Sequence, residues 1–369
     1  MSMGGARANP EWRQWNSRHN LLFAREGDPL PDLTISRADD DLALFVLAPD
    51  SRCVDSRYPV RFAESIITRS SRSEMRETIA RLLDAVHERL ESCDEAEARE
   101  YCAKWTAIRT MSREDRLLRE RAAALGLDGD DPDVVDDDFA NELVHGLAAF
   151  PPGLVDDMLG APGMLNDVRR RAAGVRDARQ TRMAEGTARI LSEARDIVEV
   201  STSSVIPPHS AGWELARRYR ERILHLDTMT IGMALDNAMD STSLLHVSEP
   251  VDFRDEFVRG WVAANATGKA SVALPKTGRT TRRFLRARAI CLALLGRRER
   301  LITNAAGYAQ SVSRAFATEL LVPAKWLMAR LEGPVATSER LSDLAMEADV
   351  HPIAVTHQVE NHRMSRVVD

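Results

Sequence analysis

Apolar residues along most of this chain recur at intervals of three and four, which is the spacing of one face of an α-helix. The clearest such stripe consists of Met75, Ile79, Leu82, Leu83, Val86 and Leu90. Ser71 lies three residues before Glu74, the spacing of a capping box, and so predicts where this helix begins. The dominant pattern is therefore helical.

Short β-rich runs precede this helix. Residues 33–36 and 42–47 are separated by the polar turn 37–41, which predicts a hairpin, and residues 59–68 predict a third extended segment. Together with the helix, these strands predict a small α+β domain over residues 1–100.

The middle of the chain has helical signals throughout, so we predict a helical domain over residues 101–200. Ser112 and Asp115 form a second capping box, and Gly126 is placed to end that helix. Residues 201–208 (STSSVIPP) are rich in helix-breaking residues and predict a linker. A third domain is therefore expected over residues 201–369.

The third domain has its own pattern of elements. Ser210 is the expected N-cap of a helix over residues 211–224, and residues 270–274 predict a strand. Pro352 fits the first position of the second of two closing helices within residues 341–363.

Composition narrows the class of protein. The chain has 369 residues, of which 44% are hydrophobic and 29% charged, as expected of a globular protein with real cores. The net charge of -6 argues against a wholesale nucleic-acid or membrane binder. The sequence contains no apolar run long enough to span a bilayer and no signal-like start, and its four cysteines form no CxxC pair. We therefore expect a cytoplasmic protein with reduced thiols and no membrane partner.

Three stretches of the last domain have a recognisable order. The first is Arg282-Arg283-Phe284 followed by the helical run 287–296 (ARAICLALLG). The second is residues 310–323 (QSVSRAFATELLVP), and the third is the closing helix pair. This order resembles the ImmA/IrrE family of metallopeptidases, in which Arg-Phe precedes an A-H-E-x-x-H helix and a later helix reads E-x-x-A-N-x-F-A-x-x-L-L-x-P.

The resemblance implies an α+β, predominantly α-helical protein whose C-terminal domain is zincin-like, with a small sheet and a closing helix-turn-helix. Matched from Phe284, the two histidine ligands fall on Arg288 and Leu292, and the general base falls on Ala289. The third ligand, a glutamate in the family, falls on Gln310. All four functional positions are replaced.

These replacements remove the chemistry of an HExxH site. That motif works because residues i and i+4 share a helix face, so two imidazoles can meet one zinc ion. Arg288 has no lone pair to offer, Leu292 has no donor atom, and Gln310 alone is a poor ligand. No HExxH occurs anywhere in the sequence. We therefore expect no zinc and no other cofactor.

The family's roles in cleaving or engaging repressors suggest a non-catalytic regulatory module that engages a repressor-like protein partner. The remnant peptidase cleft is the predicted binding site, with these residues: Arg288, Ala289, Leu292, Gln310 and Glu319. Arg288 is expected to pair there with Gln310, with Glu319 or with a ligand's carboxylate. An active zinc endopeptidase with unrecognised ligands remains an alternative.

A basic patch precedes the first signature helix, and its residues are Lys276, Arg279, Arg282, Arg283 and Arg286. Arginines of this kind bind phosphate backbones or acidic protein segments, and they also occur on solvated helix faces. With the closing helix pair, the patch leaves a DNA-binding regulator as a further alternative.

Overall fold

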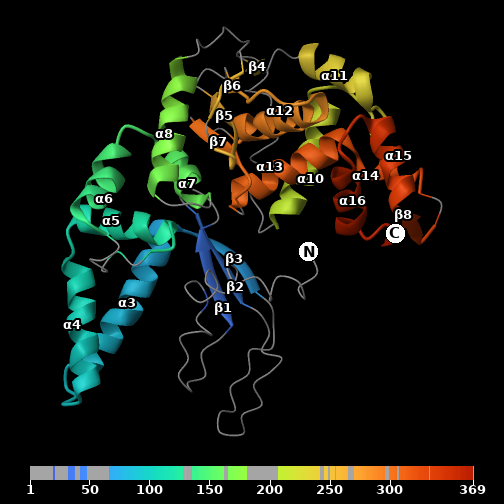
Figure 1. Ribbon diagram of the computed structural model, residues 1–369. Coiled ribbons are helices and arrows are strands. Elements are labelled where there is room, and N and C mark those ends of the chain that lie inside the picture. The colour runs from blue at the N-terminus through green and yellow to red at the C-terminus, as the bar shows by residue number, and fades with distance from the viewer. Residues whose placement is uncertain are drawn as a thin grey trace, which may run out of the picture. The chain divides into compact units, whose positions relative to one another are not determined.

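The computed structural model describes residues 20, 32–37, 42–47, 66–127, 129, 135–161, 165–180, 207–241, 245–247, 250–253, 255–264, 270–295, 299–305, 307–331 and 333–368. Most of these residues are helical, with small sheets, so the predicted α+β and mainly helical class is confirmed (Figure 1). No helix among them is long and apolar enough to cross a membrane. The chain folds into two compact units, residues 1–148 and residues 149–369, where the sequence predicted three domains.

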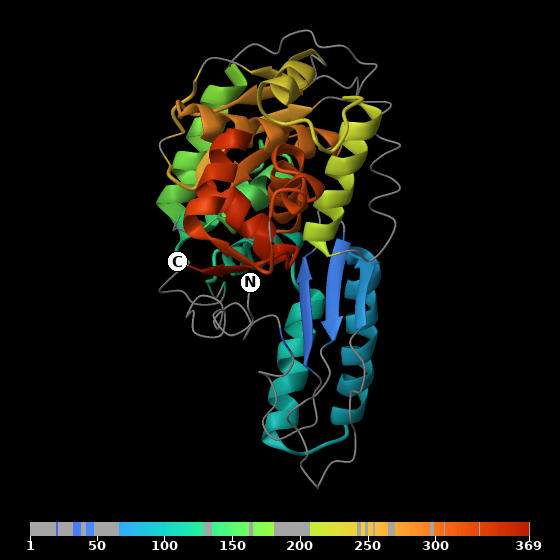
Figure 2. The same ribbon diagram turned by 90° about the vertical axis from the view of Figure 1, so that its right-hand side faces the viewer.

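The first unit contains a three-stranded antiparallel sheet and a series of helices. Its strands are β1 (Leu33–Arg37), β2 (Leu42–Leu47) and β3 (Ile66–Ser71), in that spatial order. Its helices are α3 (Arg72–Leu90), α4 (Ala96–Thr110), α5 (Arg113–Ala124) and α6 (Asp137–Asn141), followed by a π-helical turn (Glu142–Gly146). The predicted hairpin is confirmed, and the sheet lies beside α3 (Figure 2).

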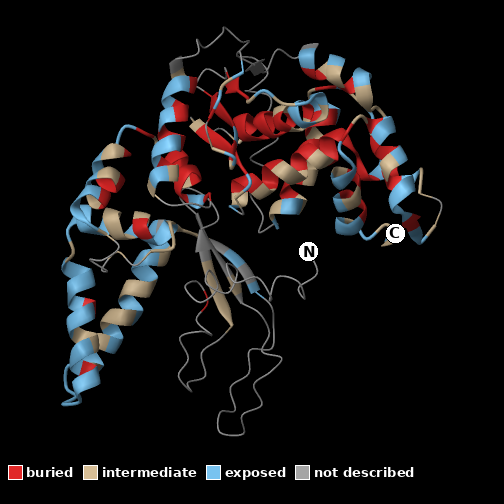
Figure 3. Cartoon of the chain, in the orientation of Figure 1, coloured by how far each residue is buried: buried red, intermediate tan, exposed pale blue. Residues whose placement is uncertain are grey.

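Both serines of the predicted capping boxes are the N-caps of their helices. The Glu74 backbone N–H donates to the Ser71 hydroxyl, and the Asp115 N–H donates to the Ser112 hydroxyl. Gly126 has a φ of 82°, which ends α5 in the left-handed conformation that glycine adopts easily. The apolar stripe of α3 is only partly covered by described residues, and Leu82 on it is 63% exposed (Figure 3).

The second unit contains most of the buried hydrophobic residues in the described part of the chain. Its first helices are α7 (Pro152–Gly160), α8 (Leu165–Gln180), α10 (Pro208–Arg222) and α11 (Gly232–Ser241). Then come β4 (Leu245–Val247), β5 (Val258–Ala264), β6 (Ala270–Ala273), α12 (Arg279–Leu294), β7 (Glu299–Thr303) and α13 (Tyr308–Leu321). The closing elements are α14 (Ala324–Met328), β8 (Val335–Thr337), α15 (Ser338–Ala348), α16 (Pro352–Asn361) and β9 (Arg366–Val368).

The helix α10 begins earlier than the sequence predicted, and Ser210 is not its N-cap. Pro207 occupies the cap position and Pro208 is the first helical residue. Proline fits there because its fixed φ suits a helix and its missing N–H would have had no intrahelical partner. Pro352 begins α16 as predicted, after an N-cap at His351.

The four-stranded sheet of this unit has the order β4-β6-β5-β7, so β7 is an edge strand. Strands β4 and β6 are parallel, and the other pairs are antiparallel. One face packs on α12 through an apolar cluster that includes Val262, Ile302 and Leu285. Two further helices contact the sheet, α7 at β7 and α8 at β5. These contacts place α7 and α8 in the second unit and not in a separate helical domain.

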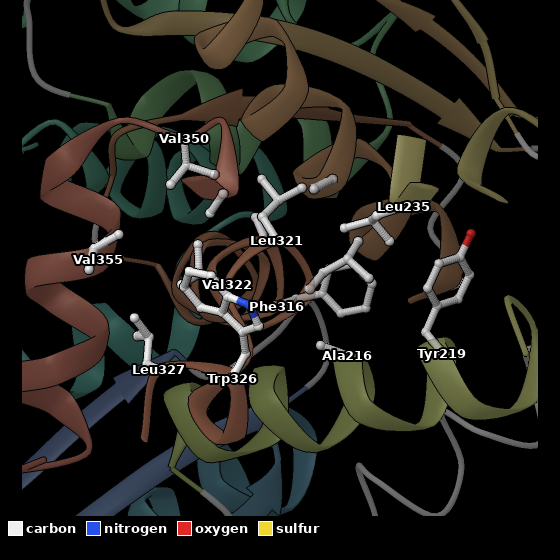
Figure 4. Packing of buried hydrophobic residues seen from close by; sticks show 14 of the residues in the cluster. Ala216, Tyr219, Leu235, Phe316, Leu321, Val322, Trp326, Leu327, Val350 and Val355 are labelled. Carbon is white, nitrogen blue, oxygen red and sulfur yellow. The ribbon is translucent and has the colours of Figure 1, made fainter. Parts of the chain in front are cut away.

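The largest core lies between α10, α13 and the closing helices (Figure 4). Trp326 of α14 and Phe316 of α13 are fully buried in it, and the Phe316 ring lies 5.8 Å from that of Tyr219. A close helix crossing makes this packing possible. A Cβ atom added to Gly212 of α10 would lie 2.5 Å from the Val312 carbonyl oxygen of α13.

We therefore expect Gly212→Ala to destabilise the second unit. The added methyl group meets backbone and would force the two helices apart, which costs about 1–3 kcal/mol in a packed core. Thermal unfolding followed by circular dichroism measures the change. Gly160→Ala is the matched control, because a Cβ atom there meets nothing within 4 Å. Equal effects of the two substitutions would contradict the close crossing.

Candidate functional site

Arg288 is a residue of α12 and is only 2% exposed. Its Nη2 donates to the Gln310 side-chain oxygen at 2.7 Å and to the Thr303 carbonyl oxygen at 2.8 Å. Its Nε donates to the Ser313 hydroxyl at 3.1 Å. Burial, and then the nearby Arg314 guanidinium, lower the pKa of Arg288 to about 9, so it remains charged at neutral pH. Arg288 is thus held inside the unit by neutral acceptors.

Gln310, on α13, makes four hydrogen bonds through its amide group. Its oxygen accepts from Arg288 and from the Thr303 backbone N–H at 3.1 Å. Its nitrogen donates to the Leu301 carbonyl oxygen at 2.7 Å and to the Asp157 carboxylate at 3.1 Å. The side-chain amide therefore makes the same pair of bonds to β7 that the backbone of an added strand would make.

Asp157 of α7 completes the group from a distant part of the sequence. Its carboxylate accepts from the Leu301 backbone N–H and pairs with the Arg300 guanidinium, each at 3.0 Å. Burial raises the pKa of Asp157 to about 6, against the opposing effects of Arg300, Gln310 and the Leu301 N–H. The Asp157 side chain thereby ties α7 to the edge strand β7.

The three side chains together cover the outer edge of β7. The outward N–H and C=O groups of Leu301 and Thr303 would otherwise be unpaired, which is costly when buried and invites pairing with another chain. Here Asp157, Gln310 and Arg288 satisfy all four groups. We call these three residues the edge cluster.

The remaining residues of the predicted cleft lie elsewhere. Ala289 and Leu292 are fully buried in the apolar cluster between α12 and the sheet. Glu319 lies nine residues after Gln310 on α13, which is two and a half turns and so the opposite side of the helix. The structure brings together Arg288 and Gln310, and it leaves Glu319 apart from both.

Glu319 belongs to a second buried group that joins the first and last helices around this core. Its carboxylate accepts from Arg217 Nε of α10 at 2.8 Å and from the Ala324 N–H at 3.2 Å. It also accepts from the side chain of Gln358 on α16. All five predicted cleft residues are at most 2% exposed, so none forms a contact surface in this structure.

The predicted basic patch is largely neutralised. Arg283 is buried and donates to Asp236 at 2.6 Å, Arg286 pairs with Asp240, and Arg279 pairs with Asp349 at 2.9 Å. Lys276 and Arg282 are exposed.

The residues at the matched ligand positions do not fit a zinc ion. The position that the resemblance matches to the first histidine holds the Arg288 guanidinium, and the Gln310 oxygen already accepts two hydrogen bonds. In the described part of the chain, no group of three or more His, Cys, Asp or Glu side chains could hold a metal ion. The site therefore has the chemistry of a structural hydrogen-bond network.

Asp157, Ser313 and Thr303 were missed as site residues by the sequence analysis. Asp157 lies among the apolar residues Leu154, Val155, Met158 and Leu159, so a buried carboxylate on an apolar helix face was the available signal. Its partners are 144 and 153 residues away in sequence, and no local pattern indicates that distance.

Comparison with known proteins adds no further constraint, because no family model, curated protein or solved structure matches the chain.

The raised pKa of Asp157 predicts a pH dependence of stability. Between the unfolded pKa near 4 and the folded pKa near 6, the folded state binds the proton more tightly than the unfolded state. The free energy of unfolding of the wild type should therefore fall, relative to Asp157→Asn, as the pH rises from 4 to 7. Urea unfolding at a series of pH values measures both proteins. A difference that stays flat, or that favours the wild type at higher pH, would contradict the account.

Proposed function

We propose that the second unit is a zincin-like, ImmA/IrrE-type domain in which the edge cluster replaces the metal centre, and that the protein is a non-catalytic regulatory module that binds a protein partner. The observation behind this proposal is the contact between Arg288 and Gln310. Sequence matching assigned these two positions to ligands of one metal ion, although they are 22 residues apart. Their side chains lie 2.7 Å from each other across α12 and α13.

The order of elements also supports the resemblance. The two signature helices, α12 and α13, pack against each other, with the edge strand β7 between them in sequence. The closing pair α15 and α16 packs on the same core as α13. This arrangement is what a metallopeptidase-like scaffold requires, since its ligands come from two facing helices beside a sheet.

The charges of the edge cluster oppose cation binding. The guanidinium groups of Arg288, Arg300 and Arg314 are set against the carboxylates of Asp156 and Asp157, which leaves one surplus positive charge. A divalent cation placed there would be repelled at short range by the excess positive charge, and burial strengthens that repulsion. Catalysis by a zinc-bound water has no support from these side chains.

The second part of the proposal, that the protein binds a protein partner, rests on the family resemblance. Resemblance to a family that engages repressors suggests a repressor-like protein partner. Because the predicted cleft residues are buried, the partner would contact the outer surface of the unit. The edge cluster then acts in stabilising the scaffold.

The zinc content of the purified protein tests the non-catalytic part of this proposal. The untagged chain, purified without chelator, is measured by elemental mass spectrometry and incubated with casein as an unstructured substrate. We expect far less than one zinc per chain and no casein fragments. About one zinc per chain, with cleavage that a chelator abolishes, would instead identify an active peptidase whose ligands were unrecognised.

Restoring the ligands tests the resemblance itself. The variant Arg288→His, Leu292→His and Gln310→Glu places the family's three ligands on α12 and α13, and we expect it to bind about one zinc per chain. The matched control moves the histidines by one position, with Ala289→His and Ala293→His beside Gln310→Glu. Circular dichroism confirms that each variant folds. A folded ligand-restored variant with no more zinc than the control would overturn the assignment.

A further inference from the structure

Trp213, on α10, contacts two histidine rings. The centre of the His362 ring, at the C-terminal cap of α16, lies 3.9 Å from that of the indole, with 33° between the ring planes. The ring of His209, one turn before Trp213 on α10, meets the indole edge-on at 5.0 Å. The stack of His362 on Trp213 therefore joins the end of the closing helix pair to α10.

His362 also faces the buried carboxylate of Glu319 on α13. Its Nε2 atom lies 3.7 Å from Glu319 Oε2, which is within ion-pair reach but beyond hydrogen-bond distance. That nitrogen is enclosed and forms no hydrogen bond within the described part of the chain. One turn earlier on α16, the Gln358 side chain donates to the same carboxylate oxygen. The end of α16 is therefore set against a fixed negative charge.

Three features of this position favour a charged imidazole over a neutral one. The first is the Glu319 carboxylate, whose side chain is only 2% exposed, so that solvent screens it little. The second is the indole of Trp213, because the face of an aromatic ring attracts cations. The third is the C-terminus of α16, where the helix dipole favours positive charge.

Two nearby basic groups act in the opposite direction, and both are weakened. Arg217 donates to the other oxygen of Glu319 at 2.8 Å, but its side chain is 42% exposed, so solvent screens its charge. Burial, and then the charge of His362, lower the pKa of His209, which is therefore the neutral member of the pair near neutral pH.

Other charged residues around α16 point to solvent. The helices α14 and α15 and the strand β9 also pack against α16, and their charged residues are exposed. They are Lys325, Glu339, Arg340, Asp343, Glu347 and Arg366. On α16 itself, His357 and Glu360 are exposed as well. Glu319 is thus the buried charge that faces His362.

We propose that His362 is a proton-sensitive latch for the closing helix pair. Its charged form pairs with Glu319 and stacks on Trp213, which fastens the end of α16 to α13 and α10. Histidine changes its charge between about pH 5 and 8, so this fastening is complete at the acidic end of that range and is lost as the pH rises. The inference goes beyond the proposed function and does not rest on it, since none of these residues lies at a matched ligand position.

Hydrogen–deuterium exchange of the full chain, followed by mass spectrometry at pH 6 and pH 8, tests the latch. Rates corrected for the chemical exchange rate at each pH report how often each segment opens. We expect the α16 segment to open about three- to tenfold more often at pH 8 than at pH 6. The α12 segment of the same molecules is the internal reference for changes in overall stability, such as that caused by Asp157.

Two histidine variants assign the effect to one residue. His362→Phe keeps an aromatic ring against Trp213 and removes the charge, so it should abolish the difference between pH 6 and pH 8. The matched control is His357→Phe, at an exposed histidine of the same helix, which should behave as the wild type does. Glu319→Gln should also abolish the difference, and circular dichroism confirms that each variant folds.

Three results would overturn the proposal. The first is an α16 segment whose opening in the wild type changes no more with pH than that of α12. The second is an opening that becomes rarer as the pH rises. The third is an equal pH response of the wild type and of folded His362→Phe. The zinc content of the same preparation reports on the proposed function separately, so the two ideas fail by different measurements.

Discussion

The hydrogen bonding of the β7 edge is the constraint on which the second unit depends. An edge strand inside a domain must find partners for its outward backbone groups, and here three side chains from three helices supply them. The bond from Asp157 spans 144 residues of sequence, and those from Arg288 and Gln310 come from the helices on either side of β7. The helices α7, α12 and α13 are therefore fixed on one strand at once. Because those partners are buried, loss of any one leaves a desolvated polar group behind, which costs more than the bond itself contributes.

The same constraint explains why the chain divides after residue 148 and not near 200. Asp157 ties α7 to β7, while Arg171 and Arg179 of α8 pair with Asp255 and Glu299. These charges are largely shielded from solvent, so they specify which helices belong to the sheet. In the function that we propose, the module is organised around a hydrogen-bonded arginine at the position that the resemblance matches to a metal ligand.

Local chemistry made much of the architecture predictable. Capping boxes located α3 and α5, periodicity located the helices, and Pro352 located the start of α16, because these signals act within a few residues. The pairing of Arg288 with Gln310 could be anticipated only because a resemblance in the order of motifs suggested a relation between two separate helices. Asp157 could not be found, since nothing near it in the sequence indicates a partner on β7. Glu319 was misplaced for a related reason: grouping it with Gln310 ignored the half turn that separates them around α13.

We infer that Arg288 and Gln310 act as one unit in holding the edge of β7. A double-mutant cycle with Arg288→Met and Gln310→Leu, measured by urea unfolding, tests this most directly. Each single substitution should destabilise the fold, and the two effects should fail to add by about 1–3 kcal/mol, as for residues in one hydrogen-bond network. Additivity within about 0.5 kcal/mol would mean that the two side chains act independently, and the account of the edge cluster would be wrong.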